Sequence, residues 1–208
     1  MTVLAFLNQK GGTGKTTLSL NVAYGLAQAG ERVLLIDADQ QASANAWSSL
    51  REDQPFSVFA VPRKNLHKEV DRQRDIYDWI VIDGTPRDDA ITRSCLIAAD
   101  LAVIPIEPSA LSAWASDRTV GQVEEARIYR PDLRAYFVIS RKIAGTILGR
   151  EMRMLDLPLP ALETEITQRV AFAESMLQAQ SIQEYAPNSP AAREIDELIE
   201  ELRNISLQ

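Results

Sequence analysis

The nine residues 9–17, QKGGTGKTT, constrain the fold more than any other stretch of this chain. The apolar run TVLAFLN at 2–8 comes directly before them and predicts a buried strand. Residues 16–30 follow with apolar side chains at helical spacing and end at Gly30, which is typical of a helix C-terminus. A strand, a glycine-rich turn and a helix in this order form a phosphate-binding loop, because the backbone N–H groups at the helix start point at the anion.

The residues of this loop have separate tasks. The glycines allow the backbone to turn its N–H groups inward, Lys15 adds a positive charge at the β- and γ-phosphates, and the Thr16 hydroxyl is a ligand for Mg²⁺. A strict Walker A motif has glycine at position 9, where this chain has Gln9. The sequence therefore predicts a nucleotide site that contains Gly11, Gly12, Thr13, Gly14, Lys15 and Thr16.

Short apolar runs alternate with segments of helical spacing along the rest of the chain. Strands are expected at 2–8, 32–37, 56–61, 78–83, 100–106 and 135–140, with a short edge strand at 160–166. Helices are expected at 16–30, 43–50, 64–75, 89–98, 112–129, 146–155, 167–179 and 190–204, with Ser43 as an N-cap and with Pro105 and Pro108 ending the strand at 100–106. Strands of consecutive apolar residues are buried on both faces, which predicts a doubly wound α/β fold with a mostly parallel sheet flanked by helices. No linker or internal repeat divides residues 1–208, so we expect a single domain.

Three aspartates lie at the ends of predicted strands. Asp37 and Asp39 follow the strand at 32–37, and Asp83 ends the strand at 78–83, where a Walker B acid is expected. Ligands of parallel sheets bind at the carboxyl ends of the strands, so these acids should meet the phosphate loop at one site. A carboxylate there holds Mg²⁺ directly or through water.

Composition matters here for what it excludes. The single cysteine, Cys95, rules out an internal disulfide and a cluster site, and the single histidine, His67, argues against a histidine-based metal site or catalytic triad. The longest apolar stretches, about five to seven residues, fall short of the about 20 that span a membrane, and the first ten residues do not read as a signal peptide. We therefore expect a cytoplasmic protein.

Charge is unevenly distributed along the chain. The net charge is −7, which argues against binding of polyanions by the surface as a whole. Residues 127–153, however, carry seven basic and two acidic side chains, whereas residues 191–208 carry five acidic side chains and two arginines. The last segment is amphipathic but acidic, so an anionic membrane would repel it.

The chain resembles the deviant-Walker ATPases of the ParA/MinD family, and within it the small ParA proteins of the ParF-like branch. The resemblance rests on LNQKGGTGKTTLSLNVAYGLAQAGERVLLIDADQQASANAW, YDWIVIDGTP, DLAVIPIEPSALS and FVISRK, which run in family order over roughly residues 1–142. It implies a P-loop ATPase that hydrolyses ATP to ADP and phosphate with Mg²⁺ and with weak basal turnover.

The resemblance also implies roles for single residues. Lys10 matches the signature lysine, which reaches across a nucleotide-sandwich dimer to phosphates held by the partner, where its charge also assists phosphoryl transfer. By the same match Asp39 orients the attacking water, Asp37 lies near Mg²⁺, Asp83 is the Walker B acid and Thr17 lies at the α-phosphate.

Two further segments match the parts of the family that hold the nucleotide base. Pro105 begins the segment 105–111, which matches the segment that contacts the base and the dimer partner in the ParF-like branch. Arg141 lies in SRK at 140–142, where relatives have Asn-Arg. Ser140 replaces the asparagine that reads adenine, and Gly84 replaces the more usual Thr, Ala or Ser after the Walker B acid.

The partners that the resemblance implies are a second copy of the chain, nonspecific DNA and an adaptor. Such ATPases form a dimer when they bind ATP. The dimer binds DNA through basic residues and is therefore nucleoid-associated. A ParB- or ParG-like adaptor on the cargo stimulates its ATP hydrolysis. The candidates for DNA contact are Arg141, Lys142, Arg150, Arg153 and Arg169. DNA partition is the predicted function. The alternatives are a relative that positions another cargo, a MinD-like membrane-cycling regulator and a metabolic enzyme on the same scaffold.

Overall fold

The computed structural model describes residues 1–86, 88–108, 117–145 and 156–207 of the 208-residue chain. Its strands are β1 (Thr2–Phe6), β2 (Val33–Asp37), β3 (Ser57–Ala60), β4 (Trp79–Asp83), β5 (Leu101–Ile106), β6 (Arg134–Lys142) and β7 (Ala161–Thr167). Its helices are α1 (Lys15–Gln28), α2 (Ser43–Ser49), α3 (Leu66–Gln73), α4 (Asp89–Ala98), α6 (Asp117–Arg127), α8 (Val170–Leu177), α9 (Ile182–Tyr185) and α10 (Pro190–Ser206).

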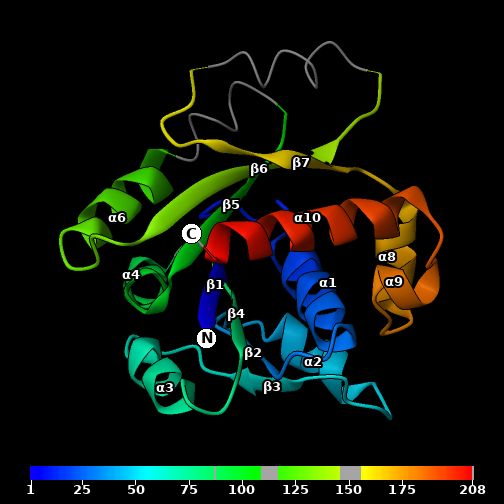
Figure 1. The fold of residues 1–208 in the computed structure, drawn as a ribbon, viewed down its shortest axis with the longest axis horizontal. Helices are drawn as coiled ribbons and strands as arrows, with labels where there is room; N and C mark the ends of the chain where they lie inside the picture. Colours follow the sequence, from blue (N-terminus) through cyan, green and yellow to red (C-terminus); the bar gives the residue numbers. More distant parts are fainter. Residues whose placement is uncertain (87, 109–116, 146–155, 208) are drawn as a thin grey trace.

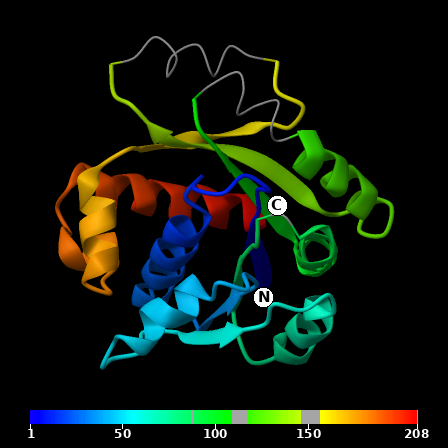
Figure 2. The ribbon, with the colours of Figure 1, turned by 180° about the vertical axis from the view of Figure 1, so that it is seen from behind.

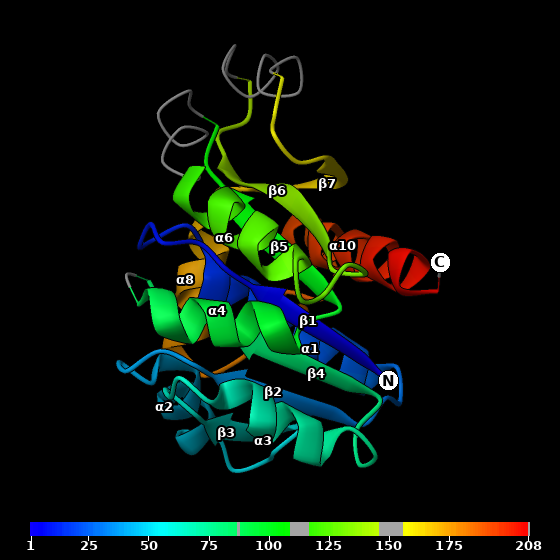
Figure 3. The same cartoon turned by 90° about the vertical axis from the view of Figure 1, so that its left-hand side faces the viewer.

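The strands form one parallel sheet in the order β3-β2-β4-β1-β5-β6-β7, twisted as Figures 1 and 2 show. The inner strands are buried along their whole length because helices cover both faces, as the continuous apolar runs predict. One hydrophobic cluster packs α3, α4 and α6 on one face, and the other packs α1, α2, α8, α9 and α10 on the opposite face. Figure 3 shows α4 and α6 on one side of the sheet and α1 and α10 on the other. The predicted fold class is confirmed.

Helix α10 protects the edge of the sheet at β7. Its apolar side, which includes Ile195 and Leu198, is buried, while two of its acids turn toward the strand. The carboxylate of Glu201 accepts hydrogen bonds from the backbone N–H groups of Glu163 and Thr164 at 2.7 and 2.9 Å. Glu194 accepts from the Thr167 N–H at 2.9 Å. These bonds satisfy N–H groups that an edge strand would otherwise present to another chain.

Three local expectations need correction. Ser43 is not an N-cap: α2 begins after Ala42, and Asp37 accepts its first N–H groups, from Ala44 and Asn45, at 2.9 and 3.0 Å. Pro105 does not stop a strand, because it lies inside β5 and pairs with Val138 of β6. Helix α9 lies between α8 and α10, where no helix was expected.

Other expectations fall partly on residues outside the description. The predicted helix at 146–155 lies there, as does the start of the predicted helix at 112–129. Within the described ranges, none of the helices combines the length and the apolar character needed to cross a membrane.

Candidate functional site

The phosphate loop joins β1 to α1 in the predicted way. Gly12 and Gly14 have φ values of +78° and +96°, which favour glycine, and Gly14 sits at the N-cap of α1. The N-cap residue Gly14 has no side chain with which to cap this helix start, so the first N–H groups of α1, which have no partner within the helix, suit an anion. Lys15 is almost fully buried, and its Nζ donates to the Lys10 carbonyl oxygen at 3.1 Å. Burial lowers the Lys15 pKa, and the carboxylates of Asp83 and Asp39 oppose that shift.

Asp37 and Asp83 lie side by side as register partners at the ends of β2 and β4, and both are fully buried. Burial raises the pKa of Asp83 to about 7, while a hydrogen bond with the Thr16 side chain lowers it. Oδ1 of Asp83 accepts a long hydrogen bond of 3.4 Å from Ser19, and Oδ2 has no hydrogen-bond partner among the described residues. A buried carboxylate oxygen without a partner, next to a threonine hydroxyl, fits the oxygen chemistry of a Mg²⁺ site.

Asp37 has a different environment from Asp83. Three backbone N–H groups, those of Asp39, Ala44 and Asn45, donate to its carboxylate at 3.0, 2.9 and 3.0 Å. Burial raises the Asp37 pKa, and these hydrogen bonds oppose the shift. Asp37 thus holds the start of α2 and the loop with Asp39 in place, and its contact with a metal stays a prediction.

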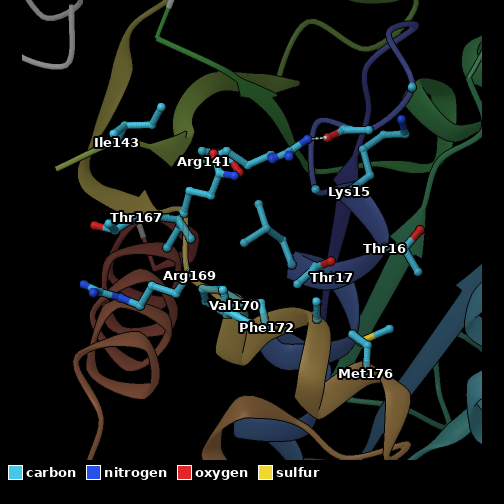
Figure 4. A pocket seen from close by; sticks show the side chains of 18 of the residues that line it. Lys15, Thr16, Thr17, Arg141, Ile143, Thr167, Arg169, Val170, Phe172 and Met176 are labelled. Atoms are coloured by element: carbon cyan, nitrogen blue, oxygen red, sulfur yellow. Dashed lines mark hydrogen bonds between the residues drawn. The ribbon is translucent and has the colours of Figure 1, made fainter. Parts of the chain in front are cut away.

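A cavity of about 920 Å³ runs from the phosphate loop to α8. Gly11, Gly12, Gly14, Lys15, Thr16, Thr17 and Asp39 line one end. Figure 4 shows Arg141 of β6 reaching toward the loop, with Val170 and Phe172 on the wall made by α8. The loop end suits phosphate groups, and the more apolar far end suits a flat ring.

Several predicted site residues lie near the cavity without lining it. Thr13 is fully buried in the loop, and its hydroxyl has no partner among the described residues. Pro105 is buried in β5, where its carbonyl oxygen accepts a 2.8 Å hydrogen bond from the side chain of Asn8. In this structure Pro105 holds the end of β1 through this hydrogen bond, and its contact with the nucleotide stays a prediction. Residues 109–111 of the same segment lie outside the description.

Lys10 extends to the surface from the mouth of the loop. Its side chain is 40% exposed, and its Nζ lies 2.7 Å from the carboxylate of Glu107, just after β5. Arg141, with a φ of +57° that is uncommon for a residue with a side chain, contacts the same carboxylate at 3.2 Å. Its Nη1 also donates to the Gly12 carbonyl oxygen at 2.7 Å. Glu107 was not singled out from the sequence. Its position directly after a predicted strand, at the edge of the sheet where ligands bind, was a signal for a site residue.

A second missed cluster joins the loop to α4 and α6. The Gln9 side chain donates to Asp89 and to Gln122, the latter at 3.2 Å, and Arg118 forms an ion pair with Asp89. The residue that departs from the strict Walker A motif therefore ties the loop to two helices. Asp89 and Gln122 lie far from Gln9 in the sequence, so the residues around Gln9 do not indicate these contacts.

The predicted DNA-contact residues that the structure describes have acidic neighbours. Lys142 pairs with Glu165, and Arg169 lies 2.6 Å from Glu194. Arg150 and Arg153 lie outside the described residues. The contact of these basic residues with DNA stays a prediction.

Comparison with known proteins bears on the same site and fold. The family model of the CobQ/CobB/MinD/ParA nucleotide binding domain matches residues 4–182. The Maintenance of carboxysome distribution protein A of Halothiobacillus neapolitanus is 33% identical over 206 residues, which cover 96% of this chain and 95% of that protein. The chromosome-partitioning ATPase Soj of Thermus thermophilus is 26% identical, with 96% and 94% covered. The structure of the septum site-determining protein MinD of Pyrococcus horikoshii, complexed with Mg-ADP, has a TM-score of 0.79 at 18% identity and covers 99% of this chain and 97% of that one.

Proposed function

The chain belongs to the CobQ/CobB/MinD/ParA nucleotide-binding family as an ATPase that uses ATP, ADP and Mg²⁺, and from this premise we propose that it is an ATP-driven switch. In this proposal two copies pair around ATP, the pair binds DNA nonspecifically, and an adaptor on a cargo stimulates hydrolysis and releases the pair. Pairing and interaction with adaptors are typical of ParA/MinD ATPases. Our proposal extends them to this chain.

Each residue of the site has a role in the proposal. Lys15 and the N–H groups at the start of α1 bind the phosphates, and Thr16 with Asp83 holds Mg²⁺. When bound there, Mg²⁺ would neutralise charge on the phosphate oxygens. Asp39, which lines the phosphate end of the cavity, orients the attacking water. Lys10 offsets the charge of phosphates held by the second copy.

The observation that carries the proposal is the different placement of the two lysines. Lys15 is buried within the loop, whereas the Lys10 side chain is 40% exposed at the surface. One lysine is sufficient for the phosphates of its own loop. A second lysine that projects from the mouth of the loop is placed for an anion that approaches from outside, such as ATP held by a second copy.

The test is the molar mass of the full chain by light scattering during size exclusion, with Mg²⁺ and either ADP or a nonhydrolysable ATP analogue. We expect a dimer only for wild type with the ATP analogue. Lys10→Ala should stay monomeric, while Lys68→Ala, which removes an exposed lysine from α3, should pair normally. A wild type that stays monomeric, or a Lys10→Ala variant that pairs like wild type, would refute the proposal.

DNA binding and nucleoid association rest on local charge rather than on net charge. Lys142 and Arg169 lie on neighbouring segments of the β6–β7 edge, and pairing of two copies would double their number. The measurement is fluorescence anisotropy of a nonspecific duplex over a series of salt concentrations. Lys142→Ala and Arg169→Ala should weaken binding of the ATP form and flatten its salt dependence, whereas Arg72→Ala on α3 should not. Equal binding by all four proteins would contradict this assignment.

The names of the relatives support two different kinds of cargo. Soj is named as a chromosome-partitioning ATPase, which supports a DNA cargo and hence a partition function. The carboxysome distribution protein is 33% identical over nearly the whole chain, which supports a protein body as the cargo. Deletion of the gene in its source organism separates the two, because loss of plasmid or chromosome copies indicates the first and misplaced protein bodies indicate the second.

A further inference from the structure

Glu107 lies between the two cations at the mouth of the phosphate loop. Its carboxylate is 2.7 Å from Nζ of Lys10 and 3.2 Å from Nη1 of Arg141, and its side chain is 29% exposed. The same Nη1 donates to the Gly12 carbonyl oxygen at 2.7 Å. One carboxylate thus contacts both basic groups that flank the loop, although the three residues come from distant parts of the chain.

The backbone around Glu107 is held by a second contact. The side-chain amide of Asn8 donates to the Pro105 carbonyl oxygen at 2.8 Å, and its oxygen accepts the Lys10 N–H at 2.9 Å. Asn8 therefore fixes the main chain on both sides, two residues before Glu107 and at Lys10 itself. This arrangement holds the two backbone segments together and keeps the side chains of Glu107 and Lys10 within reach of each other.

We propose that Glu107 is an internal competitor for phosphate that sets the ATP concentration at which the switch operates. Its carboxylate presents to Lys10 and Arg141 a negative charge of the kind that a phosphate group would bring. Lys10 must leave Glu107 to reach a phosphate of a second copy, and Arg141 must share its guanidinium. The part that concerns Lys10 rests on the proposed function, whereas the part that concerns Arg141 applies to nucleotide bound by a single copy.

The size of the effect follows from exposure. The side chains of Lys10 and Arg141 are 40% and 44% exposed, so solvent and salt screen both ion pairs. Exposed pairs of this kind contribute up to about 1 kcal/mol each, which corresponds to a shift of at most about fivefold in a half-saturating concentration. Competition of this size adjusts a threshold without abolishing binding.

The test compares wild type with Glu107→Gln, which keeps the size of the side chain and removes its charge. Glu125→Gln is the matched control, because it removes the same charge from an exposed ion pair with Arg93 on α4 and α6. A fluorescent nonhydrolysable ATP analogue with Mg²⁺ is titrated at low protein concentration to measure binding. Light scattering at higher protein concentration then measures pairing. Both titrations are repeated with Lys10→Ala and with the double variant.

We expect Glu107→Gln to lower both half-saturating concentrations about two- to fivefold, and the difference from wild type to shrink at high salt. The double variant should still bind the analogue more tightly than Lys10→Ala alone, because loss of the Glu107 charge still releases Arg141. Unchanged or weaker binding by Glu107→Gln, or an equal shift in Glu125→Gln, would overturn the proposal. If wild type never pairs, the proposed switch fails, and the binding titration alone still decides whether Glu107 competes for phosphate.

Discussion

Asp83 is an acid that the fold buries completely at the end of β4. Burial raises its pKa to about 7 from the about 3.9 expected in the unfolded chain. A raised pKa means that the folded state binds the proton more tightly. The contribution of Asp83 to stability is therefore fully present below about pH 4 and is lost as the pH rises through about 7.

Asp83→Asn should stabilise the protein in the absence of nucleotide and metal. At pH 8 we expect the free energy of unfolding to rise by on the order of 1–3 kcal/mol, because an ionised oxygen without a partner is removed. The measurement is the thermal midpoint at pH 5 and pH 8 for wild type, Asp83→Asn and Asp132→Asn, the last at an exposed position. The gain should be larger at pH 8 and absent in Asp132→Asn. In contrast, Asp83→Asn should lose the stabilisation that Mg²⁺ with ADP gives wild type. A variant that melts no higher than wild type at either pH would contradict this account.

The proposed function assigns Asp39 to catalysis rather than to binding. It is half-buried, lines the phosphate end of the cavity, and accepts a 3.0 Å hydrogen bond from the Gln41 N–H. Asp39→Ala should keep ATP affinity within about twofold but slow hydrolysis by on the order of 10²–10⁴, as expected for loss of a group that positions and activates water. The pair formed on ATP should then persist, which phosphate release and size exclusion measure together. Normal turnover by a monomeric variant would exclude this role.

At the scale of elements, α1 and α10 approach closely at Gly25. A Cβ atom there would lie 2.3 Å from Cδ1 of Ile199 and 3.0 Å from Nε2 of Gln183. Gly25→Ala should therefore lower the free energy of unfolding by on the order of 1 kcal/mol, because crowding exceeds the gain in helix propensity. Gly121→Ala on α6 is the control: none of the described residues has an atom within 4 Å of its added Cβ beyond its own helix and chain neighbours, so it should raise stability by about 0.5–1 kcal/mol. Urea unfolding measures both, and equal gains would show that the contact is easily relieved.

The identity of the main elements could be predicted because their signals are local. A few residues of sequence are enough to recognise the apolar runs of β1, β2, β4 and β5. The same holds for the helical spacing of α1 and α4. The cap of α2 was missed because Asp37, the residue that accepts its N–H groups, lies on the preceding strand. Gly84 is explained only by packing, since a Cβ there would lie 2.6 Å from the Phe6 carbonyl oxygen.

Helix α10 shows the same limit at the C-terminal end of the chain. Its amphipathic, acidic pattern argued against a membrane-binding role but did not say what the acids do. In the structure Glu194 and Glu201 bind the N–H groups of β7, and the apolar side is buried against the domain. The helix is thus already committed to covering the sheet edge, which disfavours the membrane-cycling alternative.

At the scale of the whole molecule, the phosphate end of the site was predictable and its surroundings were not. Lys15, Thr16 and Asp83 follow from motifs at the ends of adjacent strands, and the structure brings them together. Glu107, by contrast, reaches Lys10 across 97 positions of sequence. Such pairs depend on the order of strands in the sheet, and several orders are compatible with the same apolar runs.

The prediction that residues 1–208 form a single domain concerns this scale too, and Cys95 provides its test. Cys95 is fully buried in the core on the α4 side of the sheet, whereas Trp47 and Trp79 belong to the core on the α1 side. Burial also raises the pKa of the thiol, so the native protein should not react with a disulfide reagent.

In increasing urea, reaction of the thiol and the change in tryptophan fluorescence should follow one transition. The reason is that the two hydrophobic clusters lie on opposite faces of the same inner strands. The chain has a single cysteine, so the fraction of chains whose thiol has reacted reports the unfolded fraction directly. Fully denatured protein sets the end point of the reaction. Two separated midpoints would instead divide the chain into units that unfold independently, and rapid reaction without urea would place Cys95 outside the core.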